Sequence, residues 1–541
     1  MESRSYDFAM RLFWAWISLR VVVWSTASAY RYQNPPVDVA EMLAWGAQWQ
    51  WGYYKHPPLP AWCAEALAWA FHGWLPALYL TSHLFLTVAV WTAWRIGREL
   101  LGEKKALLAA LSLEATCFFT WFGGELNHNT ALTCFWALAI WSLWKAVSSG
   151  QWSWWVVYGV VTGLGLLSKY NMGLLVAWQA VALVLFLEGR RTLTTPKPWV
   201  AWGIALALFS PHLIWLIDQD WITLRYLAGR GGNRNGWFAY ASGIVGFLAE
   251  QSWMAWGLLL PLLPVLRGRK RDISGNKELE RHLCVVVLGP IVTILMMVLA
   301  GKRVIGFWCF PCYTFAGVVL LARWGAKDDG LRFRASVGLS AAIALGLLAL
   351  TLWGDPFLVS RGSSTVRSRF PGKALAEAAE SAWFEQTGNT RIPIVAGEHW
   401  VADNLSLFSH GRPTVYVGES PQSPLPVSRY NPWTGDMDFK HQGGVFAWET
   451  AKSPIEVERD LRSRFPGIRL MPRSCRQPST NLDQLNFKIK VAAGRNAAAR
   501  AAIAISELAG NEELAFAALF HAGHALVPPL NDFLLTQGEG E

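Results

Sequence analysis

The sequence predicts a helical protein that crosses a membrane many times and carries a small α/β domain toward its C-terminal end. The chain of 541 residues is 53% hydrophobic and only 16% charged, whereas a soluble chain has about a quarter charged residues. It contains 33 tryptophans, which gather at lipid–water boundaries because the ring is buried while its N–H stays hydrated. A change of composition after residue 354 predicts the second domain.

Eleven apolar runs approach the length of about 20 residues that spans a bilayer. They lie at 8–29, 77–97, 105–122, 128–148, 152–168, 171–188, 198–217, 238–266, 283–301, 304–323 and 335–354. The first run has a possible signal-peptide cleavage site at Ala27-Ser28-Ala29, but Arg11 and Arg20 interrupt it and ten runs follow, which favours an uncleaved span. The shorter, proline-bounded segment 57–75 predicts a helix along the interface.

The basic residues predict the orientation, because cytoplasmic loops collect Lys and Arg. With the N-terminus in the cytoplasm, every loop predicted to be inside is basic, most densely at 267–281. This bias explains the net charge of +10 better than nucleic-acid binding does. The segment after 354 then lies outside.

Several cations run against this bias, because they fall on the predicted outer side. A bound phosphate would hold them there, although ordinary loop charge or contact with lipid headgroups explains any single one equally well. These residues are Lys55, Lys169, Arg225, Arg230, Arg234, Lys302 and Arg303.

The polar stretch 30–62 has the residue types of a catalytic loop. Asp38 and Glu41 are three residues apart and share a face of a predicted helix, where one carboxylate can deprotonate an acceptor hydroxyl or amine. Lys55 and His56 precede two prolines, and a pre-proline residue is held extended, which fixes the direction of His56. The competing interpretations are that Asp38 caps the helix and that His56 is structural.

The other predicted outer loops complete a polar constellation. GELNHNT at 124–130 contributes Glu125, Asn127, His128 and Asn129. A carboxylate, several cations and many aromatic rings beside lipid suit a lipid-linked phosphate as leaving group, because cations stabilise the charge that develops on it. Glu125 and His128 are equally well explained as ordinary loop residues. No outer loop has the histidine spacing of a metal site.

The C-terminal part predicts a small α/β domain over 355–484. Short strands are expected at 392–398, 414–419 and 444–449, followed by a helix that Ser453 caps. Residues 485–541 have Ala-rich helical patterns and a polar end, and nothing in them indicates a function. The predicted division is therefore a transmembrane catalytic domain at 1–354, the α/β domain and a helical tail.

GYYKHPPLPAW at 52–62 resembles the Gly-Tyr-Tyr-Asp/Glu-His/Lys-Pro-Pro-Leu signature of bacterial GT-C glycosyltransferases. These are relatives of dolichyl-phosphate-mannose protein mannosyltransferase and of the lipid A aminoarabinose and galacturonate transferases. Weaker matches follow in the family's order over about residues 8–325: NHNTALTCFWALAIWSLWKA, GLGLLSKYNMGLLV, SPHLIWLIDQDWITLRYL and KRVIGFWCFPCYTFAGVVLL.

The resemblance implies a GT-C fold in a bacterial inner (cytoplasmic) membrane. It implies that a sugar on a polyprenyl phosphate is transferred on the periplasmic side with inversion, and that Asp38 is the catalytic carboxylate. The chain departs from the family at Val39, where a second acid is usual, and at Asn129, where Asp is common. Lys55 replaces an acidic residue that binds metal in some relatives, so we expect no family-type divalent metal site and a direct contact of Lys55 with phosphate.

The sequence thus predicts a hexosyl- or pentosyltransferase that moves a sugar from a polyprenyl-phosphate donor to a lipid, glycan or protein acceptor. The predicted catalytic residues are Asp38, as general base, and Glu41, in support. The residues predicted to bind the donor phosphate are Lys55, His56, Arg225, Arg230, Lys302 and Arg303. The residues predicted to bind substrate are Tyr53, Tyr54, Glu125, His128, Asn129 and Lys169.

Two other classes of protein compete with this prediction. A transporter or flippase for a lipid-linked sugar needs charges along a path through the membrane and broken helices in paired halves. The charges here gather on one face, and the sequence has no internal repeat. A non-catalytic membrane scaffold leaves the outer carboxylate and cations unexplained.

Overall fold

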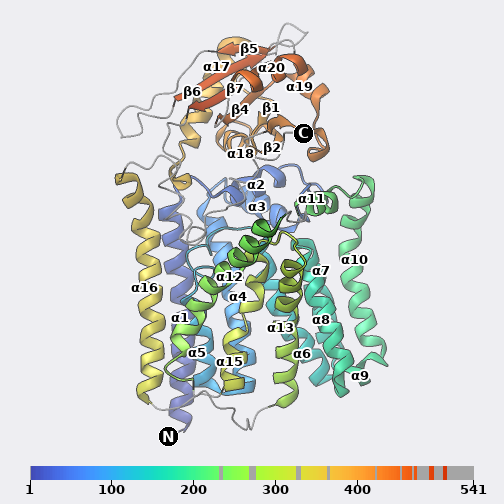
Figure 1. Ribbon diagram of the computed structural model, residues 1–541, viewed down its shortest axis with the longest axis vertical. Coiled ribbons are helices and arrows are strands. Elements are labelled where there is room, and N and C mark those ends of the chain that lie inside the picture. The colour runs from blue at the N-terminus through green and yellow to red at the C-terminus, as the bar shows by residue number, and fades with distance from the viewer. Residues whose placement is uncertain are drawn as a thin grey trace.

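A bundle of long helices forms one end of the protein and a sheet with its helices forms the other (Figure 1). Two short helices, α2 (Val37–Gly46) and α3 (Leu59–Ala70), lie between them. The computed structural model describes residues 2–230, 236–266, 276–324, 330–361, 366–420, 423–450, 454–465, 468–471, 486–492 and 504–508.

Each of the eleven apolar runs contains a helix. The main helix of each run is, in chain order, α1 (Glu2–Arg31), α4 (Pro76–Leu101), α5 (Glu103–Glu114), α6 (His128–Ser149), α7 (Trp152–Ser168), α8 (Asn171–Leu185), α10 (Pro196–Asp218), α12 (Trp237–Leu259), α13 (Lys277–Leu299), α15 (Ala316–Trp324) and α16 (Gly330–Ser360). The other helical elements of this part are α9 (Leu187–Leu193), α11 (Ile222–Arg230), α14 (Phe310–Tyr313) and the 3-10 turns η1 (Leu260–Leu262) and η2 (Gly306–Cys309).

Six helices in the described part of the chain are long and apolar enough to cross a membrane: α1, α4, α6, α10, α13 and α16. The segments Gly306–Tyr313 and Ala316–Trp324, bent by 60°, add a seventh if they form one span. Helices α7 and α8 are apolar but shorter. A polytopic helical fold is therefore confirmed, whereas the count of eleven spans stays a prediction.

Arg20, which interrupts the first apolar run, is satisfied inside the bundle. Its guanidinium donates to the carboxylate of Glu114 on α5 at 2.8 Å and to the carbonyl of Phe119 at 2.6 Å. The indole N–H of Trp24 donates to the same carboxylate. Removing one partner from a buried pair costs about 3–5 kcal/mol, because the other charge stays buried and unpaired. This charge in the membrane region is structural.

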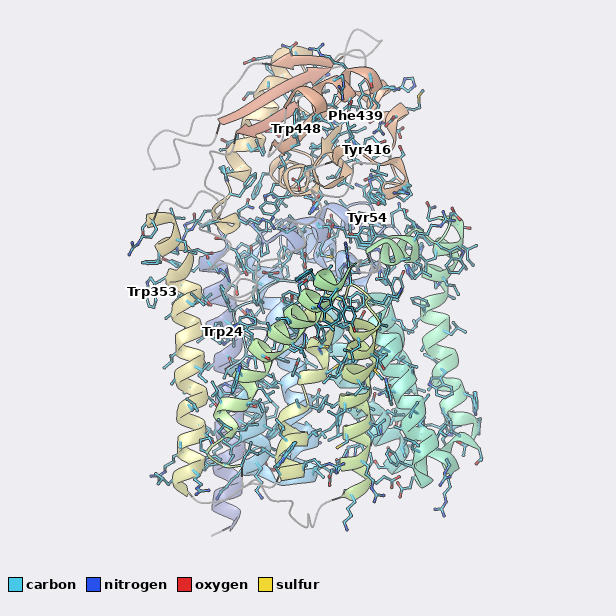
Figure 2. The ribbon with its side chains drawn as sticks, viewed as in Figure 1. Trp24, Tyr54, Trp353, Tyr416, Phe439 and Trp448 are labelled. Atoms are coloured by element: carbon cyan, nitrogen blue, oxygen red, sulfur yellow. The ribbon has the colours of Figure 1, made fainter. Side chains whose placement is uncertain are left out.

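The segment predicted to lie along the interface forms α3. Exposed rings gather where it ends, and Trp69, Phe71 and Trp74 are all exposed. Trp353 is also exposed, toward the end of α16 that is nearer the sheet domain (Figure 2). Exposed aromatic rings of this kind suit the lipid–water boundary.

The C-terminal domain is a mixed sheet of seven strands in the order β3-β2-β1-β4-β7-β6-β5. The strands are β1 (Ile394–Gly397), β2 (Thr414–Ser420), β3 (Ser423–Pro426), β4 (Val445–Thr450), β5 (Ile468–Met471), β6 (Asn486–Ala492) and β7 (Ala504–Leu508). Strands β2, β1, β4 and β7 pair in parallel, and β3, β6 and β5 are antiparallel to their neighbours. The small C-terminal α/β domain is confirmed, and β1, β2 and β4 are the predicted strands.

The structure corrects the prediction of Ala-rich helices at two places in 485–541. Strand β6 lies within this segment, and β7 pairs with β4 from Phe446↔Ala504 to Thr450↔Leu508. The Ala-rich segment at β7 becomes a strand because backbone pairing with β4 and β6 outweighs a weak local preference for helix. The end of the chain from 509 lies outside the described residues. The proposed domain boundaries stay a prediction, and α16 continues past 354 to Ser360.

The remaining helical elements follow α16 in the chain. They are η3 (Arg367–Arg369), α17 (Gly372–Thr387), α18 (His399–Phe408), η4 (Ser428–Tyr430), α19 (Asp436–Gln442) and α20 (Pro454–Arg464), the last being the predicted helix after Ser453. One hydrophobic core contains Val39 and Leu43 of α2, Leu405 of α18 and Val395 of β1. The C-terminal domain therefore packs directly on the stretch that carries the predicted catalytic residues.

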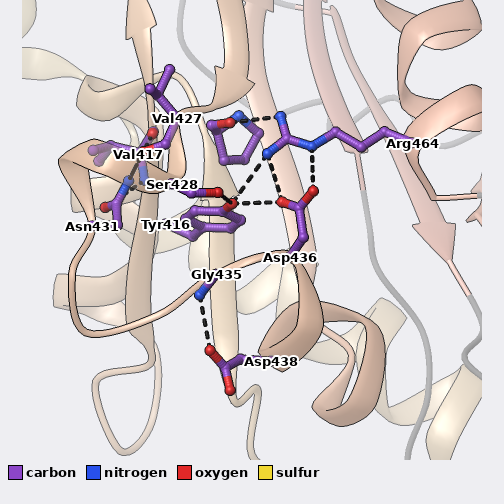
Figure 3. A network of polar contacts seen from close by, with 10 residues as sticks. Tyr416, Val417, Val427, Ser428, Asn431, Gly435, Asp436, Asp438 and Arg464 are labelled. Atoms are coloured by element: carbon purple, nitrogen blue, oxygen red, sulfur yellow. Dashed lines mark hydrogen bonds and ion pairs between the residues drawn. The ribbon is translucent and has the colours of Figure 1, made fainter.

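A closed polar network ties α19 and α20 to the sheet (Figure 3). The Arg464 guanidinium donates to both carboxylate oxygens of Asp436, at 2.6 and 2.7 Å, and the Tyr416 hydroxyl donates to the same carboxylate at 2.5 Å. Another Arg464 nitrogen donates to the carbonyl of Pro426 at 2.6 Å. Burial opposes ionisation, but the hydrogen bonds from Arg464 and Tyr416 lower the pKa of Asp436 below its ordinary value. Both charges are satisfied, so this network stabilises the domain.

Candidate active site

Helix α2 brings both predicted catalytic carboxylates to the junction between the bundle and the C-terminal domain. Pro36 occupies the N-cap, where its extended backbone starts the helix without a side-chain bond. Asp38 lies in the first turn, where a carboxylate faces the positive end of the helix dipole. The N-cap interpretation of Asp38 is therefore wrong, and its side chain is half-buried among polar groups.

Asp38 is held by an amide from the second outer loop. Asn127 Nδ2 donates to one Asp38 oxygen at 2.9 Å, while the Asn127 side chain also caps α6 by accepting from the backbone of Asn129 and Thr130. Lys169, after α7, donates to Asn129 Oδ1 at 2.6 Å. Burial lowers the pKa of Lys169 to about 8, and the charge of Asp38 limits the drop. Three segments distant in sequence thus build one polar cluster around Asp38.

Glu125 lies at the edge of this cluster. Its carboxylate accepts from the Tyr32 hydroxyl at 3.3 Å. Burial raises the pKa of Glu125 to about 7, the charge of Asp38 adds to the rise, and Arg31 opposes it. The predicted substrate residue therefore does lie within electrostatic reach of the predicted base.

Glu41 does not support Asp38 directly but forms a buried ion pair with Lys55. Their side chains are 8% and 14% exposed. Burial alone would lower the pKa of Lys55, but the charge of Glu41 holds it well above its ordinary value. The ammonium also lies 5.1 Å from the centre of the Tyr54 ring, within cation–π range.

The GYYKHPP motif is a tight turn. Tyr53 N–H donates to the carbonyl of His56 at 3.0 Å, and His56 N–H donates back at 3.2 Å. The His56 ring lies 4.1 Å from the ring of His128. His128 Nδ1 is 2.9 Å from the carbonyl of Ser168, which orients the ring. The turn therefore places both predicted histidines side by side next to Lys55.

Aromatic contacts fasten this turn to its surroundings. Tyr53 stacks on Trp45 at 4.9 Å. Tyr54 stacks on Tyr430 of the C-terminal domain at 4.4 Å and meets Tyr226 of α11 edge-on at 5.2 Å. Figure 2 shows Tyr54 between the bundle and the sheet domain. The predicted substrate tyrosines thus act as packing residues that position Lys55 and His56.

The other predicted phosphate ligands lie outside the buried cluster. Arg225 pairs with Asp220, and both side chains are more than 60% exposed. Lys302 and Arg303 are exposed in the turn after α13. Arg230 ends α11, and its side chain, like all of Arg234, lies outside the described residues. Among the described cations of the predicted outer side, Lys55 pairs with Glu41 and Lys169 belongs to the polar cluster around Asp38.

The chain is similar to known membrane transferases along most of its length. A family model described as dolichyl-phosphate-mannose-protein mannosyltransferase matches residues 55–215. The lipopolysaccharide core galacturonosyltransferase RgtA of Rhizobium johnstonii is 24% identical over 79% of this chain and 85% of the relative. The lipid A galacturonosyltransferase RgtD of the same organism is 24% identical over 68% of this chain and 76% of the relative.

The fold agrees with this similarity. ArnT from Cupriavidus metallidurans in its apo state matches with a TM-score of 0.57 at 12% identity, covering 86% of this chain and 96% of that one. The structure of the same protein bound to undecaprenyl phosphate matches with a TM-score of 0.50 at 13% identity, covering 75% of this chain and 86% of that one. In sequence and in fold the chain is similar to GT-C glycosyltransferases. The predicted resemblance and the predicted enzyme class, a glycosyltransferase, are confirmed.

This glycosyltransferase has additional polar residues at the junction that the sequence prediction missed. His399 and Asp403 lie on α18, which packs against α2. The sequence does contain a feature that could have identified them. Polar residues, His399 among them, directly follow the predicted strand 392–398, and binding sites often form at the carboxyl ends of parallel strands. Across the described residues, no group of three or more His, Cys, Asp or Glu side chains is placed to hold a metal ion.

Proposed function

We propose that this glycosyltransferase moves a sugar from a polyprenyl phosphate to lipid A or the lipopolysaccharide core, with inversion, on the periplasmic face of a bacterial inner membrane. The observation that carries the proposal is the junction itself, where Asp38, held by Asn127, lies near the buried Lys55–Glu41 pair. The names of the relatives support the acceptor, and the undecaprenyl phosphate in the ArnT structure supports the donor.

Asp38 acts as the general base in this proposal. Asn127 occupies one carboxylate oxygen, which leaves the other to accept the proton of the acceptor hydroxyl. The hydroxyl oxygen then attacks the anomeric carbon while the bond from that carbon to the phosphate oxygen breaks. A single displacement inverts the anomeric configuration, and the proton ends on Asp38.

Lys55 stabilises the leaving phosphate. The bond electrons move onto the phosphate oxygen, so a fixed cation lowers the barrier most when it faces that oxygen. Before the donor binds, Glu41 and the Tyr54 ring keep Lys55 in a largely buried position, where one charge acts more strongly than at the surface.

Replacement of Asp38 tests the proposal. We expect Asp38→Asn to lower transfer of labelled sugar from a polyprenyl-phosphate donor by about 100-fold or more, with donor binding retained. Assays with purified protein in detergent use no second compartment, so turnover there also excludes a pure flippase. Asp460→Asn, at an exposed position on α20, is the matched control and keeps full activity.

Mass spectrometry identifies the acceptor in the same comparison. Cells that express the wild type should carry one additional sugar on lipid A or core, and cells with Asp38→Asn should lack it. Full transfer by Asp38→Asn would refute the assigned base. An additional sugar on a protein or a polysaccharide instead would refute the proposed acceptor.

A further inference from the structure

The contact between α2 and α18 contains more carboxyl groups than cations. Glu41 of α2 pairs with Lys55, while Glu398, His399 and Asp403 come from the start of α18. Glu398 is already used, because its oxygens accept from the backbone N–H groups of the first turn of α18, at 3.2 and 3.1 Å. The charge of Lys55 acts on Glu41, His399 and Asp403. Glu41 also interacts electrostatically with His399 and Asp403.

Asp403 is the unusual member of this group. It is 1% exposed, and within the described part of the chain neither of its carboxyl oxygens has a hydrogen-bond partner. His399 Nδ1 lies 3.7 Å from Asp403 Oδ2, which is beyond a hydrogen bond. Burial raises the pKa of Asp403 to about 8, and the charge of Lys55 opposes that rise. At neutral pH the carboxyl group is therefore protonated and able to donate.

The Glu41–Lys55 pair creates a problem for phosphate binding. If the ammonium turns from Glu41 to the phosphate of a donor, Glu41 is left as a buried carboxylate without a partner. Such a charge is strongly unfavourable unless another group replaces the lost partner. A neutral carboxylic acid nearby meets that need, because two carboxyl groups can share one proton.

We propose that Asp403, oriented by His399, is a positioning residue that frees Lys55 for the donor phosphate by donating a hydrogen bond to Glu41 in its place. This inference rests on the proposed function, in which Lys55 binds that phosphate. This exchange of partners makes and breaks no covalent bond to carbon. The proton of Asp403 is shared with Glu41. The sheet domain thus takes part in donor binding through α18. It has no role in the proton transfer proposed for Asp38.

The charged neighbours restrict how pH acts on this arrangement. Glu41 comes from α2 and Lys55 from the turn, while Glu398 and Arg367 act on His399 from the sheet domain. Burial lowers the pKa of His399, and the charge of Lys55 lowers it further, while Glu41 and Glu398 oppose this shift. Lys169, with a pKa of about 8, titrates in the same range as Asp403. A variant that changes Asp403 alone separates the two, because Lys169 is present in both proteins.

The test compares Asp403→Ala with Asp403→Asn in purified, full-length protein with a labelled polyprenyl-phosphate sugar. Asn keeps the shape and donates a hydrogen bond at every pH, whereas Ala cannot donate. We expect Asp403→Ala to raise KM for the donor by about tenfold, the loss typical of one hydrogen bond to a charge, with kcat little changed. Asp403→Asn should keep the wild-type KM at pH 7. In the wild type, KM for the donor should rise from pH 7 to 9 as Asp403 loses its proton, and this rise should be smaller in Asp403→Asn.

A double variant keeps the proposal falsifiable if Asp403→Ala is poorly stable. Glu41→Gln removes the charge that Lys55 leaves behind, so in this background Asp403→Ala should no longer raise KM. An unchanged KM in Asp403→Ala, equal defects in the Ala and Asn variants, or a full defect in the Glu41→Gln background would each overturn the inference. Active Asp38→Asn would instead overturn the proposed function, so the two failures are distinguishable.

Discussion

Two aspartates of the C-terminal domain, the half-buried Asp436 and the buried Asp403, have opposite polar surroundings. Asp436 in the sheet domain accepts from Arg464 and Tyr416, and its network is closed (Figure 3). Asp403, at the junction with α2, has a nearby cation in Lys55, but no described residue forms a hydrogen bond with either of its oxygens. A closed network is what stability requires, whereas an unsatisfied buried group persists where it serves a function. The comparison separates structural charge from functional charge in this chain.

The same contrast holds between the membrane bundle and the junction. Arg20 and Glu114 are buried together and bonded on several sides. Lys55 and Glu41 form a pair as well, but it lies beside Asp403 and the two histidines of the turn and α6. A pair with titratable neighbours can exchange partners, and a pair bonded on several sides cannot do so without loss.

The largest expected effect comes from Asp403→Asn on the free energy of unfolding. The pKa of Asp403 is raised to about 8 from an ordinary value near 4, so the folded state holds a proton that the unfolded state has lost. Wild-type stability therefore falls as pH rises through this window, by up to about 1.4 kcal/mol per pH unit. Thermal unfolding in detergent from pH 5 to 9 measures this effect. The stability of Asp403→Asn relative to the wild type should increase as pH rises. A constant difference would contradict the assignment of a neutral Asp403.

A smaller effect of opposite sign is expected for the matched variant Asp436→Asn. Arg464 and Tyr416 lower the pKa of Asp436 despite its burial, so its stabilisation is present at neutral pH and is lost as pH falls through the folded pKa. Because the pair is partly exposed, we expect a loss of about 1 kcal/mol at pH 7. The same thermal series measures it, and transfer activity of the folded protein should stay at the wild-type level. An unchanged stability of Asp436→Asn would contradict the stabilising role of the Asp436 network and thus its contrast with Asp403.

The smallest expected effect is that of a chelator, which should leave transfer unchanged. Lys55 supplies a cation at the position where some relatives have an acidic metal ligand, and the described residues offer no cluster of three ligands. Transfer by purified protein is measured before and after treatment with EDTA. Loss of activity that returns with a divalent ion would show that Lys55 is not the cation that stabilises the phosphate.

The sequence alone was sufficient for the helices of the bundle. Each apolar run contains a helix, because an apolar segment in lipid must satisfy its backbone internally, although the run 304–323 is divided between η2, α14 and α15. It was sufficient for β1, β2 and β4 as well. It failed at β6 and β7, because backbone pairing with a distant strand decides the structure of a weakly biased segment.

For the site, the sequence identified the stretch with Asp38, Lys55 and His56 through its polar residues and its signature turn. Which of these residues meet was decided by the tertiary structure, since Asn127 reaches Asp38 from 89 positions away. The pairing of Glu41 with Lys55 and the approach of Asp403 depend on the packing of α18 on α2. Residue types carry the chemistry, but only packing determines which charges lose their water and which partner each one keeps.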